Sequence, residues 1–254
     1  DYGEAMGSPR GCFGNRIYNN TFYIQGKKYK DYPGYIPMAS AFFFSTSAGD
    51  NDVFGNEIHI HQEDPQTDAE AYAFYIGNAR GGQLYNNLIT SNVTPVWVAC
   101  GYGSATGTVI AGNTFIRSAN AETNFPAIRM GWIECTDCLA KDIEFRSNTF
   151  EEMDFDIDAT DQHHSYTIYW DLTVHVIDNK EKEVRGAEVR ILDNKGEEVL
   201  RRRTNNKGSI SVELPEYKVD GNAITHMSPY TVIVNKQEKE VFLKANQEIS
   251  LPVK

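Results

Sequence analysis

The feature that most constrains the fold is a short segment centred on asparagine that recurs along the first two thirds of the chain. The first copy is Ile17 to Phe22 (IYNNTF), and the later copies read VFGNEI, LYNNLI, IAGNTF and FRSNTF. The shared residues are Asn20, Asn56, Asn87, Asn113 and Asn148, so the steps between copies are 36, 31, 26 and 35 residues. This spacing is too irregular for a helical repeat, but it is typical of stacked β-strand repeats with variable loops.

Two physical roles explain why an asparagine recurs at this position. A sharp turn between two short strands needs a residue with positive φ, and Asn tolerates that conformation better than other non-glycine residues. Asn side chains stacked in register can also hydrogen-bond to one another as a ladder. The apolar residues on both sides of the Asn are expected to fill the interior.

A second set of segments precedes the Asn turns and has the composition of short strands. These segments are Ala41–Phe44, Ala73–Ile76, Val96–Ala99 and Ala127–Met130. Each repeat is therefore predicted to contain a strand, a loop, a strand, the Asn turn and a further strand. The other interpretation is a β-sandwich in which the Asn turns coincide by chance.

The recurring G-N-x-[IF] and N-N-x-[FI] turns resemble those of the pectate-lyase-like superfamily, over roughly Gly11 to Asp158. The resemblance implies an all-β fold with a right-handed parallel β-helix of about five coils, which we assign to residues 1–163. That fold hosts lyases, hydrolases, epimerases, adhesins and surface coats, so it does not decide the function. The chain starts within a few residues of the first repeat, so we expect a piece of a longer secreted chain or an edge covered by a partner.

Residues 164–254 show a different pattern. Ile168, Trp170, Leu172, Val174 and Val176 alternate with more polar residues, as in a half-buried strand. Six further strands are predicted in 187–192, 198–203, 209–214, 230–235, 240–244 and 248–253. The segments VHVID (174–178), VRGAEVRI (184–191) and TNNKG (204–208) resemble the carboxypeptidase regulatory-like family of Ig-like domains. The resemblance implies a seven-stranded antiparallel β-sandwich, export from the cell and no catalysis.

Charge is distributed unevenly. Residues 1–165 contain 21 Asp and Glu against 10 Lys and Arg, whereas residues 166–254 contain 14 of each. Because an acidic surface repels polyanions, we expect no nucleic-acid partner, and a uronic-acid ligand would need calcium or a local basic cleft. The sequence also lacks the long apolar run that membrane insertion requires.

The four cysteines suggest two kinds of environment. Cys135 and Cys138 are three residues apart, which fits a local disulfide or half of a zinc site. Cys12 and Cys100 are interpreted as small buried side chains of the stack.

Several residues are candidates for chemistry. Asp154, Asp156 and Asp158 would lie on one face of a strand roughly 7 Å apart, which suggests either a calcium site or a solvated acidic face. Asp50 and Asp52 could act as an acid–base pair or could form an ordinary turn. Arg129 is the only basic residue within a predicted core strand, and Asn92, in Asn92-Val93-Thr94, is the candidate for glycosylation.

The sequence therefore predicts a secreted or cell-surface structural protein that serves extracellular assembly or adhesion, with carbohydrate as a further contact. Its partners would be other copies or parts of the same assembly. It requires no cofactor, although calcium would suit the aspartates. The alternative is the C-terminal part of an extracellular polysaccharide lyase or glycoside hydrolase, whose catalytic signatures cannot be matched residue by residue here.

Overall fold

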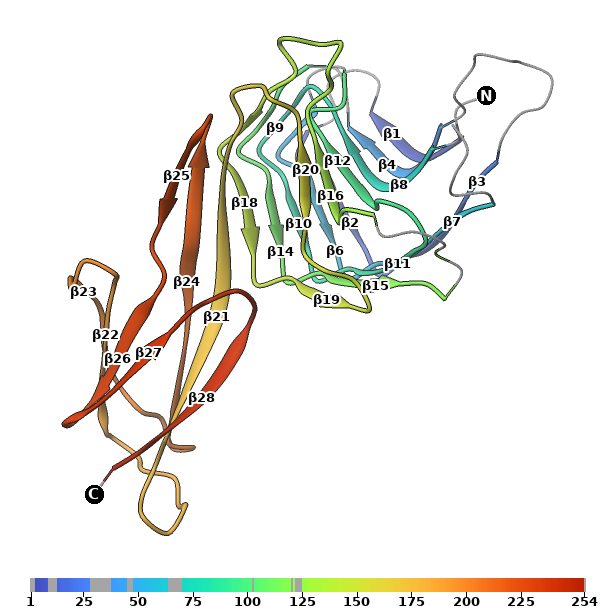
Figure 1. The fold of residues 1–254 in the computed structure, drawn as a ribbon. Coiled ribbons are helices and arrows are strands. Elements are labelled where there is room, and N and C mark those ends of the chain that lie inside the picture. Colours follow the sequence, from blue (N-terminus) through green and yellow to red (C-terminus); the bar gives the residue numbers. More distant parts are fainter. Residues whose placement is uncertain are drawn as a thin grey trace. The chain divides into compact units, whose positions relative to one another are not determined.

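The computed structural model describes residues 3–8, 13–27, 38–44, 48–63, 70–101, 103–119, 121 and 125–253. Every regular element among these residues is a β-strand (Figure 1). The chain divides into two compact units, namely Asp1–Tyr166 with Asp220–Asn222, and Thr167–Val219 with Ala223–Lys254. The expectation of an all-β protein is confirmed.

The first unit repeats one order of four strands, and each strand pairs in parallel with its counterpart in the next repeat (Figure 1). The first sheet is β1 (Gly3–Ser8), β4 (Met38–Phe44), β8 (Glu70–Ile76), β12 (Val96–Val98), β16 (Ile128–Met130) and β20 (Ile157–Ala159). A small sheet contains β5 (Ala48–Gly49), β9 (Ala79–Arg80), β13 (Ala105–Thr106) and β17 (Ala140–Lys141).

Two more sheets meet at the asparagine turns. One runs through β2 (Arg16–Tyr18), β6 (Asp52–Phe54), β10 (Gln83–Tyr85), β14 (Val109–Ala111) and β18 (Ile143–Arg146). The other contains β3 (Thr21–Gly26), β7 (Glu57–Gln62), β11 (Leu88–Ser91), β15 (Thr114–Arg117) and β19 (Thr149–Glu151). Between these two sheets the chain turns within two residues, which is why the repeated segment is so short.

Apolar side chains at equivalent positions of successive repeats fill the interior. One buried column contains Val53, Leu84, Ile110 and Phe145, which are register partners on neighbouring strands. A second column contains Ile58, Ile89 and Phe115. Full burial of one such side chain contributes about 1.5–3 kcal/mol, so the columns are a main source of stability.

The predicted asparagine ladder is present and runs through all five repeats. The side-chain amide nitrogen of each Asn donates to the side-chain oxygen of the next, at 3.1, 3.0, 2.9 and 3.1 Å from Asn20 to Asn148. The same oxygen also accepts the backbone N–H of the preceding Asn, at 3.0 Å in every step. The second amide hydrogen reaches a backbone carbonyl, as from Asn87 to Val53 at 3.0 Å. The buried amides are thus paired within the protein.

The structure corrects the conformation expected of the ladder asparagines. The residue with positive φ is the one before each of them, namely Asn19, Gly55, Asn86, Gly112 and Ser147, with φ between 49° and 62°. The turn therefore uses two adjacent positions with different tasks. The first reverses the chain in the left-handed conformation, and the second directs its amide inward. The expectation that one Asn performs both tasks was wrong.

The second unit contains an antiparallel sheet in the order β23-β22-β26-β27, and a further group of strands, β21, β24, β25 and β28. Their bounds are β21 (Ser165–Ile177), β22 (Glu188–Leu192), β23 (Glu198–Arg203), β24 (Ser209–Asp220), β25 (Ala223–His226), β26 (Tyr230–Val234), β27 (Gln237–Val241) and β28 (Gln247–Pro252). The alternation predicted for β21 is confirmed, since Ile168, Trp170, Leu172, Val174 and Val176 are buried.

One pair in this unit contradicts the expected antiparallel arrangement. Strand β28 runs parallel to β21, with Leu172 opposite Gln247 and Ile177 opposite Pro252. The preceding strand, β27, belongs to the other sheet. Because no hairpin joins β28 to its neighbour, nothing forces an antiparallel direction.

His164, near the end of the first unit in the sequence, has a buried and hydrogen-bonded side chain. Its side chain is 2% exposed, its Nδ1 accepts the N–H of Ala140 at 3.0 Å, and its Nε2 lies 2.9 Å from Oγ1 of Thr160. Since the Thr160 hydroxyl donates to Oε1 of Gln162 at 2.9 Å, the proton on the ring belongs to Nε2. Burial, and then the charge of His163, lower the pKa of His164. The fold thus requires the neutral imidazole.

The ladder predicts unequal effects for equivalent substitutions. Replacing Asn87 by Ala leaves buried donors and acceptors unpaired on both sides, so we expect the free energy of unfolding to fall by about 3 kcal/mol. Asn20→Ala removes an exposed end of the ladder and should cost about 1 kcal/mol. Urea denaturation of both variants measures the difference between their free energies of unfolding. Asn86→Gly, at the positive-φ residue of the same turn, is the control. Equal losses for Asn87→Ala and Asn20→Ala would contradict a buried, continuous ladder.

His164 predicts a pH-dependent stability. Because the folded-state pKa of His164 is lowered, its contribution to stability is complete above the unfolded-state pKa of about 6.5. That contribution is lost as the pH falls from there through the lower folded-state pKa. We expect the free energy of unfolding between pH 7.5 and 5 to fall less in His164→Asn than in the unmodified protein. His61→Asn, at an exposed histidine, is the control for the substitution itself. An identical slope in the His164 variant would disprove this assignment.

Candidate functional site

The outer face of the first sheet contains a row of large side chains in register. Phe43, Tyr75, Trp97, Arg129 and Asp158 are successive partners on β4, β8, β12, β16 and β20. Along this row the side chains change from aromatic to charged. The sequence candidates Arg129 and Asp158 are therefore cross-strand neighbours on one face.

A local irregularity in β8 adds Tyr72 to the same face. The backbone N–H groups of Ala73 and Phe74 both donate to the carbonyl of Pro95, at 2.8 and 3.2 Å, as at a β-bulge. The ring of Tyr72 then lies 5.3 Å from that of Tyr75 and 5.7 Å from that of Trp97. With Met38, Phe43 and Cys100 these rings form a buried cluster, and the interpretation of Cys100 as a small buried residue is confirmed.

Arg129 connects this aromatic cluster to a carboxylate. Its Cζ lies 5.0 Å from the centre of the Trp97 ring, a cation–π geometry. Its Nη1 lies 3.4 Å from Oε1 of Glu70 and 3.3 Å from the hydroxyl of Tyr72. The side chain of Arg129 remains 37% exposed. A guanidinium, a carboxyl and a phenol therefore meet beside a buried aromatic cluster, and solvent reaches the guanidinium and the carboxyl in part.

Burial perturbs the titrating groups at this site. Desolvation raises the pKa of Glu70, although the charge of Arg129 and the hydrogen bonds from Tyr72 and Arg129 oppose the shift. Burial, followed by the charge of Glu70, raises the pKa of Tyr72 well above its usual value. A carboxyl with a raised pKa can hold a proton closer to neutrality, as a general acid does.

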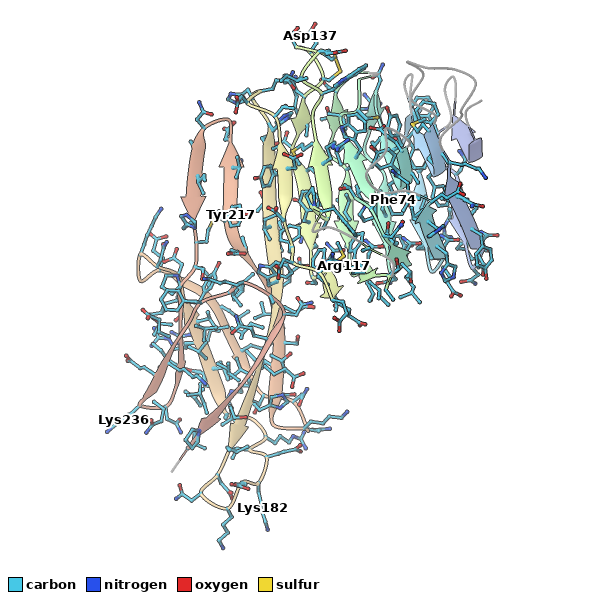
Figure 2. All side chains as sticks on the ribbon, turned by 45° about the vertical axis from the view of Figure 1, so that its right-hand side comes forward. Phe74, Arg117, Asp137, Lys182, Tyr217 and Lys236 are labelled. Carbon is cyan, nitrogen blue, oxygen red and sulfur yellow. A yellow bond between two sulfur atoms is a disulfide. The ribbon has the colours of Figure 1, made fainter. Side chains whose placement is uncertain are left out.

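A loop closed by a disulfide forms one rim of the site. Cys135 and Cys138 are disulfide-bonded, and Gln162 Nε2 donates to the carbonyls of Trp132 and Cys135 at 3.1 and 2.6 Å. The ring of Trp132 lies 6.4 Å from that of Trp97, edge to face. Ile133 is 83% exposed, and Figure 2 shows Asp137 at the tip of the loop. The loop thus presents apolar side chains to solvent.

An acidic cleft of about 580 Å³ lies elsewhere in the first unit. It is lined by Arg117, Phe125, Pro126, Glu152, Met153, Asp154 and Asp156. The guanidinium of Arg117, labelled in Figure 2, lies 5.6 Å from the centre of the Phe125 ring. Two of the three candidate calcium ligands are therefore in this cleft, while Asp158 is in the row beside Arg129.

The carboxylates do not assemble a metal site among the described residues, where no group of three or more His, Cys, Asp and Glu could hold an ion. Asp154, Asp156 and Asp158 are exposed, whereas Phe155 packs against Phe150 with ring centres 4.9 Å apart. This agrees with the interpretation as a solvated acidic face. Calcium binding here remains a prediction without geometric support.

Asp50 and Asp52 have separate structural tasks. Asp50 adopts a φ of 51° at a sharp turn, and its N–H donates to the carbonyl of Arg80 at 3.0 Å. Asp52 begins β6 and lies 3.9 Å from the side chain of Arg16. The geometry therefore favours the turn over an acid–base pair.

The structure places Asn92 in the interior, contrary to the expectation of an outward loop. It is 1% exposed, its side-chain oxygen accepts the N–H of Gln62 at 2.8 Å, and its amide nitrogen donates to the Gln62 carbonyl at 2.8 Å. A glycan could not be attached without breaking both bonds. Cys12 lies outside the described residues.

Comparison with known proteins leaves the family undetermined. No family model matches the chain, and no curated protein does. Among solved structures, the major pilin subunit BcpA of Bacillus cereus aligns with 34% of this chain and 28% of its own, at 18% identity and a TM-score of 0.26. The Bacillus anthracis TIE protein aligns with 39% of this chain and 18% of its own, at 21% identity and a TM-score of 0.28. Likenesses this low carry no functional argument.

In the part of the chain that the structure describes, no helix is long and apolar enough to cross a membrane.

The contacts of Arg129 predict a change in the titration of Glu70. Replacing Arg129 by Met removes the positive charge that lowers the Glu70 pKa, so we expect that pKa to rise further. Carboxyl-carbon NMR shifts measured against pH report it directly. Arg117→Met, in the acidic cleft, is the matched control and should leave Glu70 unchanged. A Glu70 pKa that stays constant in Arg129→Met would show that the two groups are not coupled.

Proposed function

We propose that the chain is a secreted or cell-surface structural protein that serves extracellular assembly or adhesion and contacts carbohydrate. In this proposal the first unit is a right-handed parallel β-helix of about five coils. The second is an Ig-like sandwich of the carboxypeptidase regulatory-like type. No cofactor is required.

The observation that carries the structural role is the uninterrupted ladder from Asn20 to Asn148. It fixes the register of every repeat, and a stack in fixed register is a stiff scaffold on which loops can be displayed. The disulfide between Cys135 and Cys138 supports an extracellular location, because disulfides persist in oxidising compartments. The partners we propose are other copies or parts of the same extracellular assembly.

The outer-face site supports contact with carbohydrate. The apolar faces of sugar rings pack on exposed aromatic side chains, while hydroxyl groups bond to Arg and carboxylate groups. Trp132, Arg129 and Glu70 supply these three kinds of group close together. Because residues 1–165 have a net charge of 10 − 21 = −11, we infer that neutral polysaccharides bind better than polyuronates.

The enzyme alternative is supported by the position of Glu70 beside Arg129 and Tyr72, where desolvation raises the pKa of its carboxyl. Such a carboxyl could protonate a leaving group in a polysaccharide lyase or a glycoside hydrolase. We rank this alternative second because the Glu70 carboxyl already accepts hydrogen bonds from Arg129 and Tyr72 within the protein.

Binding to a panel of immobilised neutral and acidic polysaccharides tests the proposal. We expect the neutral members to bind, and we expect Arg129→Gln to weaken binding about tenfold, the loss of one hydrogen bond at 1.4 kcal/mol. Phe242→Ala, at an exposed aromatic residue of the second unit, should bind normally. Absence of binding would exclude the carbohydrate contact, and calcium-dependent release of unsaturated or reducing products would establish the enzyme instead.

A further inference from the structure

The chain contains two tripeptides of the N-glycosylation pattern, and the structure places their asparagines in opposite environments. One is Asn92-Val93-Thr94, whose Asn is buried and bonded through both side-chain atoms. The other is Asn19-Asn20-Thr21. Asn19 and Thr21 are both exposed, so the second tripeptide is accessible in the folded protein.

The geometry of the turn makes Asn19 accessible. Asn19 has a φ of 57°, the left-handed conformation that reverses the chain, whereas the amide of Asn20 points along the ladder to Asn56. The two adjacent asparagines are therefore not equivalent. The side chain of Asn20 is hydrogen-bonded in the ladder. The side chain of Asn19 is exposed at the turn and makes no hydrogen bond to any described residue.

The other turns provide an internal comparison. The corresponding residues are Gly55, Asn86, Gly112 and Ser147. Of these only Asn86 has a side-chain amide, and Leu88 stands where the pattern needs Ser or Thr. Among the five turns, Asn19 alone combines an outward amide with a hydroxyl residue two positions later.

We propose that Asn19 is the N-glycosylation acceptor of this protein. In the transfer, the Asn19 amide nitrogen forms a bond to C1 of a sugar carried on a lipid pyrophosphate, with an oligosaccharyltransferase as catalyst. The C1–oxygen bond to the pyrophosphate breaks, the lipid pyrophosphate leaves with the electron pair, and the amide proton passes to the enzyme. Nothing is oxidised or reduced.

The fold tolerates a glycan at Asn19 and excludes one at Asn92. A sugar on Asn19 projects into solvent next to Tyr18, whose side chain is 51% exposed and stacks on Phe54 with ring centres 5.0 Å apart. The exposed part of this aromatic pair can pack against the first sugar ring. A sugar on Asn92 would have to displace Gln62 from a buried pair of hydrogen bonds.

The inference rests on the proposed extracellular location, because the transferase acts on exported chains. The test expresses the full chain behind a cleavable secretion signal in a eukaryotic host and measures its intact mass before and after peptide-N-glycosidase treatment. We expect one glycan, which Asn19→Gln and Thr21→Ala abolish. Thr21→Ser, which keeps the hydroxyl, should retain the glycan, and so should Thr94→Ala.

Two results would overturn the assignment of Asn19. One is a folded, secreted protein without a glycan, and the other is a glycan that Thr94→Ala removes. If the protein is not secreted, the same masses are measured on the pool in the secretory lumen. A missing glycan in that pool overturns the acceptor site, whereas a failure of secretion alone counts against the extracellular function.

Discussion

The buried asparagine amides impose the constraint on which the rest of the first unit depends. Each amide needs a donor and an acceptor at a fixed height above and below it, because an unpaired buried amide is costly. Successive repeats can therefore stack in one register only. The apolar columns of Val53 and Ile58 follow from that register, since a slip of one residue would turn them outward.

Fixing one corner of each repeat leaves the other connections free to vary. The repeat with a step of 26 residues from Asn87 to Asn113 and the repeat with a step of 36 residues from Asn20 to Asn56 join the same ladder. In the repeat that ends at Asn148, the additional residues include the loop that presents the disulfide and Trp132 beside Trp97 and Arg129. A rigid stack with variable loops is how a repetitive core can support an individual site.

The sequence predicted the ladder, the buried columns and the strand β21, because each depends on a local pattern repeated many times. It did not separate the turn residue from the ladder residue, since Asn is compatible with both positions and Asn19-Asn20 contains both. Strand β25 was missed because its four exposed residues lack a buried apolar face. The parallel pairing of β28 depends on a crossing between sheets that no local pattern reveals.

The candidate site was predictable only in part. Arg129 was identified as an isolated basic residue in a core strand, but its partners Glu70 and Tyr72 lie 59 and 57 residues earlier in the chain. Tyr72 reaches them through a bulge at Ala73 and Phe74, which has no sequence signature. Asn92 was misplaced for a similar reason, because an interior hydrogen bond to Gln62 cannot be read from a tripeptide.

Each ladder asparagine from Asn20 to Asn113 donates its side-chain amide to the Asn of the next repeat, and each from Asn56 to Asn148 accepts from the one before, so the ladder has a direction. A whole repeat copied from within the unit would meet the same acceptor on one side and the same donor on the other, wherever it was inserted. A repeat in the reverse orientation would set donor against donor. The length of the unit can therefore change in steps of complete repeats through duplication or deletion of gene segments, while its cross-section stays the same.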